Sequence, residues 1–320
     1  MNYNNSSLGA TGKRCAIVVI AIGESKIWDL CKKSVLKYCE KYNIELKILS
    51  EKNSELLAID DNELFNMFQK NNIYHLFNKY DRILRLDWDV LITPNCPNIF
   101  EIVPEDKIGG VFEDYGTREL ERRKRIEIIQ NHLGNIDWKN GYLNAGIIVA
   151  SKQHKEIFRL KEEDINILNK IELTNKEQSY FNYFIRKLGY EVFPLSYKFN
   201  HMSLFSESWH GYSNRLDSYF IHYAGEGIFE KKQYLKNKLQ QIKMDYKILY
   251  TEKLTNYDVD LFENERIFGL LRKKIAIIDI LCILKMFLKK DRIPLLQRLN
   301  VLRECLVLLK SYILYLFKLI

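Results

Sequence analysis

The stretch Tyr80–Ile92, with the sequence YDRILRLDWDVLI, decides how this chain folds. Its aliphatic residues predict a buried strand, and two carboxylates, Asp87 and Asp89, stand at its end. Because alternate side chains of a strand point to one face, we expect both carboxylates to point the same way. Two neighbouring carboxylates repel each other unless a divalent cation or a proton lies between them. The pair predicts a hard-cation site, although its spacing also fits two solvated aspartates at a strand end.

Apolar runs alternate with helical patterns around this stretch. The alternation predicts an α/β fold with a Rossmann-like, mostly parallel sheet flanked by helices. Ligands of such sheets bind beyond the carboxyl ends of the strands, so we expect Ala21 and Gly23, which end the first strand, to contact a bound ligand or cofactor. The expected strands cover residues 16–22, 44–49, 108–112 and 142–150, and the expected helices cover residues 25–42, 62–79 and 118–132.

Composition restricts the class of protein. The chain has 320 residues, of which 47% are hydrophobic and 28% charged, so it has enough apolar sequence for one large domain and a smaller appendage. Its six cysteines form no CxxC or Cys/His cluster, which argues against a zinc site and a disulfide framework and favours a cytoplasmic location. We expect three parts: a flexible arm at 1–13, a catalytic domain at 14–266 and a tail at 267–320.

The tail carries the net charge of the chain. Residues 267–320 contain eleven Lys or Arg and three Asp or Glu, which equals the net charge of +8 of the whole sequence. The neutral remainder argues against binding of nucleic acid. Apolar residues cover most of the tail, but charged residues interrupt it too often for a membrane span. The pattern predicts amphipathic helices on an anionic membrane surface, and the alternative is helices packed on the domain or on another subunit.

Four motifs follow one another in a recognisable order: YDRILRLDWDVLI at 80–92, YLNAGIIV at 142–149, NKEQSYFN at 175–182 and IHYAG at 221–225. In order and spacing they resemble the motif series of GT-A fold glycosyltransferases, in particular the family 8-like group. The resemblance implies a GT-A fold and transfer of a sugar, usually from a UDP-linked donor, to an acceptor hydroxyl with a Mn²⁺ or Mg²⁺ ion. The usual outcome in this family is retention at the anomeric carbon.

The resemblance also implies roles for single residues. His222 would join Asp87 and Asp89 as a third metal ligand, although a lone histidine is more often structural. Glu177 would contact a donor hydroxyl, and Gln178 would lie behind the anomeric carbon. The donor sugar would also be contacted by the segment Asn144, Ala145 and Gly146.

Two departures from the family pattern stand out. Trp88 occupies the middle of the metal motif, where family members commonly have a small residue, and we expect it to pack under the sheet. No Lys-Pro follows the histidine motif, which leaves Lys231 as the candidate to bind the donor phosphates.

Together these patterns predict a glycosyltransferase for cell-surface glycan or glycolipid synthesis. It would be attached peripherally to the inner face of the membrane and would take a nucleotide-sugar donor and a glycan or glycolipid acceptor. The alternative is a metal-dependent nucleotide-binding protein or a nucleotidyltransferase-like enzyme without sugar transfer.

Overall fold

The computed structural model describes residues 12–21, 23, 25–50, 72–115, 118–173, 175–202, 215–224 and 231–250, without the side chains of 162 and 231–237. The expected tail at 267–320 and nearly all of the expected arm at 1–13 lie outside these residues. No helix among the described residues combines the length and the apolar character needed to cross a membrane.

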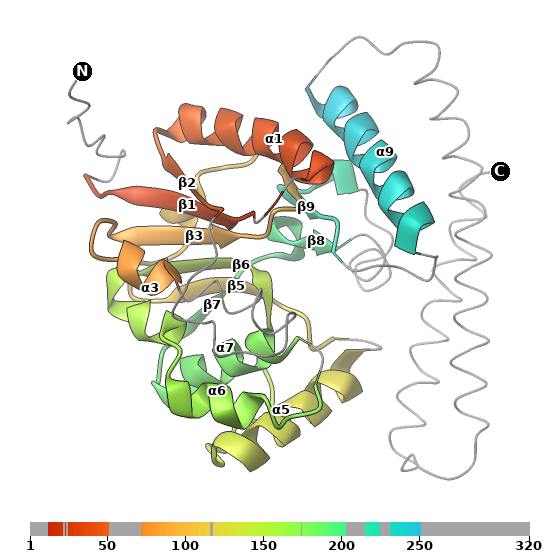
Figure 1. Cartoon of the computed structure of the whole chain (residues 1–320). Helices are drawn as coiled ribbons and strands as arrows, with labels where there is room; N and C mark the ends of the chain where they lie inside the picture. Colours follow the sequence, from red (N-terminus) through yellow and green to blue (C-terminus); the bar gives the residue numbers. More distant parts are fainter. Residues whose placement is uncertain are drawn as a thin grey trace, which may run out of the picture.

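A six-stranded sheet forms the centre of the described structure (Figure 1). Its strand order is β2-β1-β3-β6-β5-β7. The β1–β2, β1–β3 and β5–β7 pairs are parallel, and β6 is antiparallel to both of its neighbours. Its strands are β1 (Cys15–Ile20), β2 (Glu45–Leu49), β3 (Arg82–Leu86), β5 (Ile108–Phe112), β6 (Leu143–Ser151) and β7 (Val192–Pro194).

A second, three-stranded sheet lies beside the first, and the sequence patterns did not predict it. It consists of β4 (Val90–Ile92), β9 (Phe220–His222) and β8 (His201–Met202), in the order β4-β9-β8. β4 pairs antiparallel with β9, and β8 pairs parallel with β9. The small sheet therefore joins the segment after β3 to a segment 130 residues further along the chain.

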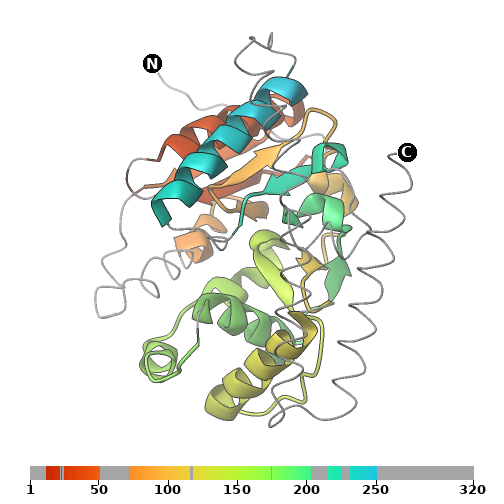
Figure 2. The same ribbon diagram turned by 90° about the vertical axis from the view of Figure 1, so that its right-hand side faces the viewer.

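Helices α1 (Lys26–Tyr42) and α9 (Lys231–Leu249) lie side by side over one face of the large sheet (Figures 1 and 2). The Ser25 hydroxyl caps α1 by accepting a hydrogen bond from the backbone N–H of Trp28 at 3.3 Å, and Asn43 ends the helix in the left-handed conformation. The apolar side chains under α1 and α9 form one core cluster with the small sheet, which fixes its position against the large one.

The other face of the large sheet is covered by α3 (Ile73–Leu76), the 3₁₀ helix η4 (Lys152–Phe158) and α7 (Lys176–Lys187). Beyond α7 lie α5 (Glu119–Leu133) and α6 (Glu162–Leu168), which pack on it through a separate apolar cluster (Figure 1). The short elements α4 (Ile99–Ile102), η5 (Tyr197–Phe199) and η6 (Arg215–Asp217) connect the strands. Helices thus flank both faces of the sheet, as the alternating patterns predicted.

Most elements agree with the sequence-based expectations. The strands expected at 16–22, 44–49, 108–112 and 142–150 and the helices expected at 25–42 and 118–132 are confirmed within one or two residues at each end. Of the helix expected at 62–79, residues 62–71 lie outside the described structure, and the helical part that follows ends at Leu76.

The strand expected before the aspartates is confirmed as β3, but the strand geometry expected at Asp87 and Asp89 is wrong. β3 ends at Leu86, and the chain turns before β4 begins at Val90 in the other sheet. Apolar residues continue through both strands, so the local pattern does not reveal the change of sheet. The change depends on β9, which pairs with β4 and is distant in sequence.

Candidate active site

The turn between β3 and β4 holds Asp87, Trp88 and Asp89 at the carboxyl end of β3. Two backbone hydrogen bonds fix it: the N–H of Asp87 donates to the Gly146 carbonyl at 2.8 Å, and the N–H of Tyr223 donates to the Asp89 carbonyl at 3.1 Å. The two carboxylates come together through this turn and not through strand alternation. Trp88 packs against the core cluster beneath α1, as expected.

His222, the last residue of β9, completes a three-residue cluster with the aspartates. Its Nε2 lies 3.3 Å from Asp89 Oδ1 and 3.7 Å from Asp87 Oδ2, and ligand atoms of the three residues lie within 4.8 Å of one another. The His222 side chain is only 3% exposed, whereas that of Asp87 is 26% exposed. The cluster is therefore buried on one side and reachable from solvent on the other.

Lys238 of α9 approaches the same cluster, and the sequence patterns did not point to it. Its Nζ donates a hydrogen bond of 2.7 Å to Asp89 Oδ2, and both side chains are nearly buried. Burial raises the pKa of the Asp89 carboxyl, but His222 and Lys238 outweigh this effect and hold the pKa below its ordinary value. Asp89 is therefore a carboxylate at neutral pH.

Two carboxylates and one imidazole are a suitable donor set for a divalent cation such as Mn²⁺, which accepts both oxygen and nitrogen ligands. The exposed side of Asp87 leaves a direction from which a further oxygen ligand can approach. The side chains predicted to hold a metal are thus brought together by the fold.

Gly146 of β6 lies directly beneath this cluster. A Cβ atom at this position would collide with the His222 ring and would lie 2.8 Å from Asp87 Oδ2. The site therefore requires glycine here, because any side chain would occupy the space between the histidine and the aspartate.

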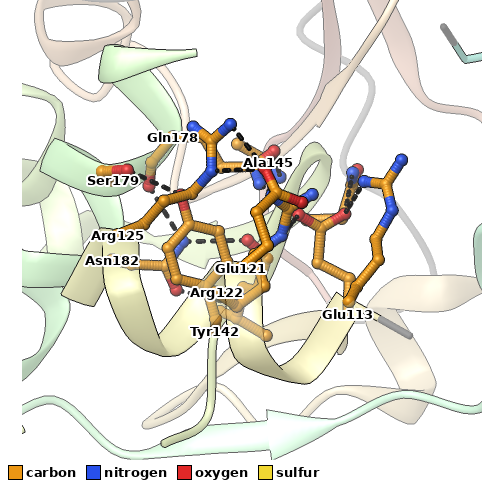
Figure 3. A network of polar contacts seen from close by, with 12 residues as sticks. Glu113, Glu121, Arg122, Arg125, Tyr142, Ala145, Gln178, Ser179 and Asn182 are labelled. Carbon is orange, nitrogen blue, oxygen red and sulfur yellow. Dashed lines mark hydrogen bonds and ion pairs between the residues drawn. The ribbon is translucent and has the colours of Figure 1, made fainter. Parts of the chain in front are cut away.

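A second polar cluster surrounds Glu113, which follows β5 and is completely buried (Figure 3). Arg122 of α5 forms an ion pair with Glu113 at 2.6 Å, and Gln178 of α7 donates its amide N–H to the same carboxylate oxygen, Oε1. The Gln178 amide oxygen accepts a hydrogen bond of 3.1 Å from the backbone N–H of Ala145. Gln178 is thus held at both polar atoms of its side chain.

Asn144 connects this cluster to the strand beside the aspartates. Its Nδ2 donates to Glu113 Oε2 at 2.9 Å, and its Oδ1 accepts from the backbone N–H of Gly146, also at 2.9 Å. Asn182 of α7 joins the same strand by accepting from the N–H and donating to the carbonyl of Leu143 at 2.7 and 2.8 Å. The polar side chains of α7 therefore fix the position of the segment 144–146.

Arg85 of β3 lies between the metal cluster and Glu177 of α7, and it was not predicted from the sequence. The guanidinium is almost completely buried and lies 3.5 Å from Asp87 Oδ1 and 3.4 Å from Glu177 Oε1. Glu177 is itself 4% exposed. A buried arginine thus compensates the charges of one predicted metal ligand and one predicted sugar-contacting residue.

The remaining predicted residues lie as follows. Ala21 follows β1 and donates its backbone N–H to Leu49 at 3.0 Å, and Gly23 has a positive φ of 80°. Lys231 begins α9, but its side chain lies outside the described structure, so its phosphate-binding role stays a prediction. The roles of the other donor-contacting residues likewise stay predictions.

Several residues of the two clusters escaped the sequence analysis, namely Arg85, Glu113, Arg122, Asn200 and Lys238. Glu113 carried one signal that could have identified it, because it directly follows a predicted buried strand. Asp114, the next residue, accepts a hydrogen bond of 2.7 Å from the Gly141 N–H and lies outside both clusters.

The comparison with curated protein sequences finds no match. Three similar solved structures are a glycosyltransferase involved in glycosylation of the major capsid of PBCV-1, the galactosyltransferase LgtC in complex with donor and acceptor sugar analogues, and the bifunctional glycosyltransferase WbbM. Their sequence identities to this chain are 14%, 13% and 14%, and their TM-scores are 0.45, 0.49 and 0.48. The matches cover 69%, 76% and 82% of this chain and 99%, 98% and 53% of the other chains.

The family model described as glycosyl transferase family 8 matches residues 14–227. This range contains both sheets and all three side chains of the aspartate–histidine cluster. The chain therefore belongs to glycosyl transferase family 8 and is a glycosyltransferase with an α/β fold of the GT-A type.

Proposed function

We propose that this enzyme transfers a hexose from a UDP-linked donor to an acceptor hydroxyl, with Mn²⁺ or Mg²⁺ held by Asp87, Asp89 and His222. The observation that supports the metal dependence most is the approach of these three side chains to within 4.8 Å of one another. A divalent ion at this place would neutralise the negative charge that develops on a departing nucleoside diphosphate.

The neighbouring residues support a sugar-binding role for the space beside the cluster. Arg85 holds the buried carboxylate of Glu177 in place. We expect this carboxylate to accept hydrogen bonds from donor hydroxyls. Gln178 is oriented by Glu113 and by the Ala145 N–H, and we expect it to face the anomeric carbon in this fixed orientation. We expect the donor sugar to approach the backbone of Asn144 and Gly146 closely.

Hydrolysis and transfer assays with the full chain test the metal and the donor together. UDP-, GDP- and dTDP-linked hexoses are incubated with Mn²⁺, with Mg²⁺ and with a chelator, and the released nucleoside diphosphate is measured. We expect release from UDP-hexoses only with a divalent ion. The proposal fails if no nucleotide sugar turns over and none binds in a metal-dependent manner.

The stereochemical outcome is a separate part of the proposal. We expect retention, and proton NMR of the first product distinguishes its two anomers before mutarotation. An inverted product would contradict retention and would leave the donor assignment intact.

The proposed cellular role is synthesis of a cell-surface glycan or glycolipid at the inner face of the membrane. It rests on the basic and apolar sequence of residues 267–320, which lie outside the described structure. Flotation with vesicles containing anionic lipid, with the full chain and with a chain ending at residue 266, tests this role. We expect only the full chain to float, and equal flotation would contradict membrane attachment through the tail.

A further inference from the structure

His222 has two ring nitrogens in different surroundings. Nε2 faces Asp87 and Asp89, and Nδ1 lies 2.8 Å from the amide oxygen of Asn200. Asn200 is completely buried and lies between the 3₁₀ helix η5 and β8. Since β8 pairs with β9 at Met202 and His222, the small sheet holds Asn200 beside the histidine.

The direction of each hydrogen bond behind His222 follows from the chemistry of Glu113. An ionised carboxylate can only accept hydrogen bonds, so the Asn144 atom that contacts Glu113 must be its NH₂ group. The Asn144 amide oxygen then points the other way, where it accepts from the backbone N–H of Gly146 and from Asn200 Nδ2, each at 2.9 Å. The backbone N–H can only donate, which independently gives the same orientation of Asn144.

The orientation of Asn144 determines that of Asn200. Because Asn200 must direct its NH₂ group to the Asn144 oxygen, its own oxygen faces His222. An oxygen acceptor at 2.8 Å requires a proton on Nδ1 of the imidazole. In neutral His222 the lone pair is therefore on Nε2, the nitrogen that faces the aspartates.

We propose that Asn200 is a positioning residue that keeps the Nε2 lone pair of His222 directed at the metal site, in an orientation that Glu113 sets through Asn144. The inference rests on the metal-binding part of the proposed function and extends it beyond the three ligands. Partners that orient a metal-binding histidine typically contribute about 10- to 100-fold to metal affinity or activity. This series of hydrogen bonds also gives a role to Glu113, which does not touch the metal cluster: it sets the orientation of Asn144 and thereby that of Asn200.

The tautomer of neutral His222 is measured in the metal-free full chain by long-range ¹H–¹⁵N correlation NMR, at an alkaline pH where its signals no longer change with pH. His222→Gln identifies the His222 signal. We expect the Nδ1–H tautomer in the wild type. Observation of the Nε2–H tautomer would overturn the proposal.

Two substitutions at Asn200 distinguish the role of its amide oxygen from the role of its side-chain volume. Asn200→Ala removes the acceptor, and we expect a mixture of tautomers and a loss of Mn²⁺ affinity of about 10- to 100-fold by electron paramagnetic resonance titration. Asn200→Asp keeps an oxygen near Nδ1, and we expect it to retain the Nδ1–H tautomer. Loss of that tautomer in Asn200→Asp would contradict the role of the oxygen.

Asn98→Ala is the matched control, because Asn98 is also a buried asparagine but caps α4 and lies outside both polar clusters. We expect it to leave the tautomer and the Mn²⁺ affinity unchanged. The inference fails if Asn200→Ala and Asn98→Ala bind Mn²⁺ equally well. Absence of Mn²⁺ binding in the wild type would contradict the proposed function, while the metal-free NMR measurement would still decide the tautomer.

Discussion

The metal cluster and the Glu113 cluster both contain buried carboxylates, but the carboxylates of the two clusters differ in their partners and in their exposure to solvent. Glu113 is completely buried, pairs with Arg122 and accepts hydrogen bonds from Asn144 and Gln178. Asp87 retains 26% exposure of its side chain and faces a second carboxylate across His222. Protein cations accompany both clusters, Arg122 the Glu113 cluster and Arg85 and Lys238 the metal cluster, but only the metal cluster has a partly exposed carboxylate that a cation from solvent can reach. From this difference we infer that the Glu113 cluster has a structural role and that the metal cluster binds a ligand.

The largest effect is expected when the negative charges of the metal cluster are removed. Asp87→Asn combined with Asp89→Asn should lower sugar transfer by about 10⁴-fold, or about 5.5 kcal/mol, since loss of one charge-stabilising group costs about 10²- to 10³-fold. Turnover of the donor that the panel identifies, at saturating Mn²⁺, measures the effect. Asp81→Asn is the control, because Asp81 lies at the other end of β3 and accepts a hydrogen bond from the Arg14 N–H. Unchanged transfer and Mn²⁺ affinity in the double variant would refute the assignment.

The second prediction concerns the Glu113 cluster. Glu113→Gln removes the buried partner of Arg122 and leaves it only the half-exposed Glu121 as an opposite charge, and loss of one partner of a buried pair costs about 3–5 kcal/mol. The free energy of unfolding in urea measures this cost. Glu121→Gln is the control: its side chain is 50% exposed, and its ion pairs with Arg122 and Arg125 should contribute less than about 1 kcal/mol. Equal stabilities of the two variants would show that Glu113 has no special structural role.

The contrast between the clusters also explains what the sequence could and could not predict. Asp87, Asp89 and His222 stand in motifs whose order identifies the family, so their approach was predictable. Glu113 follows a strand and precedes charged residues, a pattern that equally fits a solvated loop. Its burial depends on Arg122, which lies on the helix that follows, and on Gln178, which comes from a helix distant in sequence.

The strands show the same division between local and distant causes. β6 was predictable because most of its residues are apolar, and all nine of them are buried in the structure. The second sheet was not predictable, because β4 leaves the first sheet only by pairing with β9, which is distant in sequence. Asn200 carried no local signal, since its contacts with Asn144 and His222 come from two other strands.

The third prediction concerns the cation that already accompanies the metal cluster. Lys238→Met removes the charged hydrogen bond to Asp89 and should destabilise the metal-free chain at neutral pH by about 1.5–3 kcal/mol. The pKa of Asp89 is lower in the folded chain than its ordinary value of 3.8, so the stabilisation is present above this value. The difference between wild type and variant should therefore shrink as the pH falls below 3.8 toward the folded pKa.

Urea unfolding at several pH values measures this difference. Lys243→Met is the control, because Lys243 lies on the same helix but is exposed. We also expect Mn²⁺ to raise the melting temperature more in Lys238→Met than in the wild type, because the cation no longer meets a neighbouring positive charge. A pH-independent difference would contradict the pairing of Lys238 with Asp89.

The smallest effect is expected at the residue where the two clusters meet. Gly146 donates its N–H to Asn144 of one cluster and accepts through its carbonyl from the Asp87 N–H of the other. Gly146→Ala places a methyl group against the His222 ring, and overpacking of this kind costs about 1–3 kcal/mol in urea unfolding. Because the methyl group displaces ligand side chains, Mn²⁺ affinity should fall as well. Gly110→Ala, whose Cβ would have Leu143 and Ile148 side-chain atoms at 3.1–3.3 Å as its nearest neighbours, should affect stability alone. If both alanine variants bind Mn²⁺ like the wild type, the metal lies elsewhere than between His222 and the aspartates.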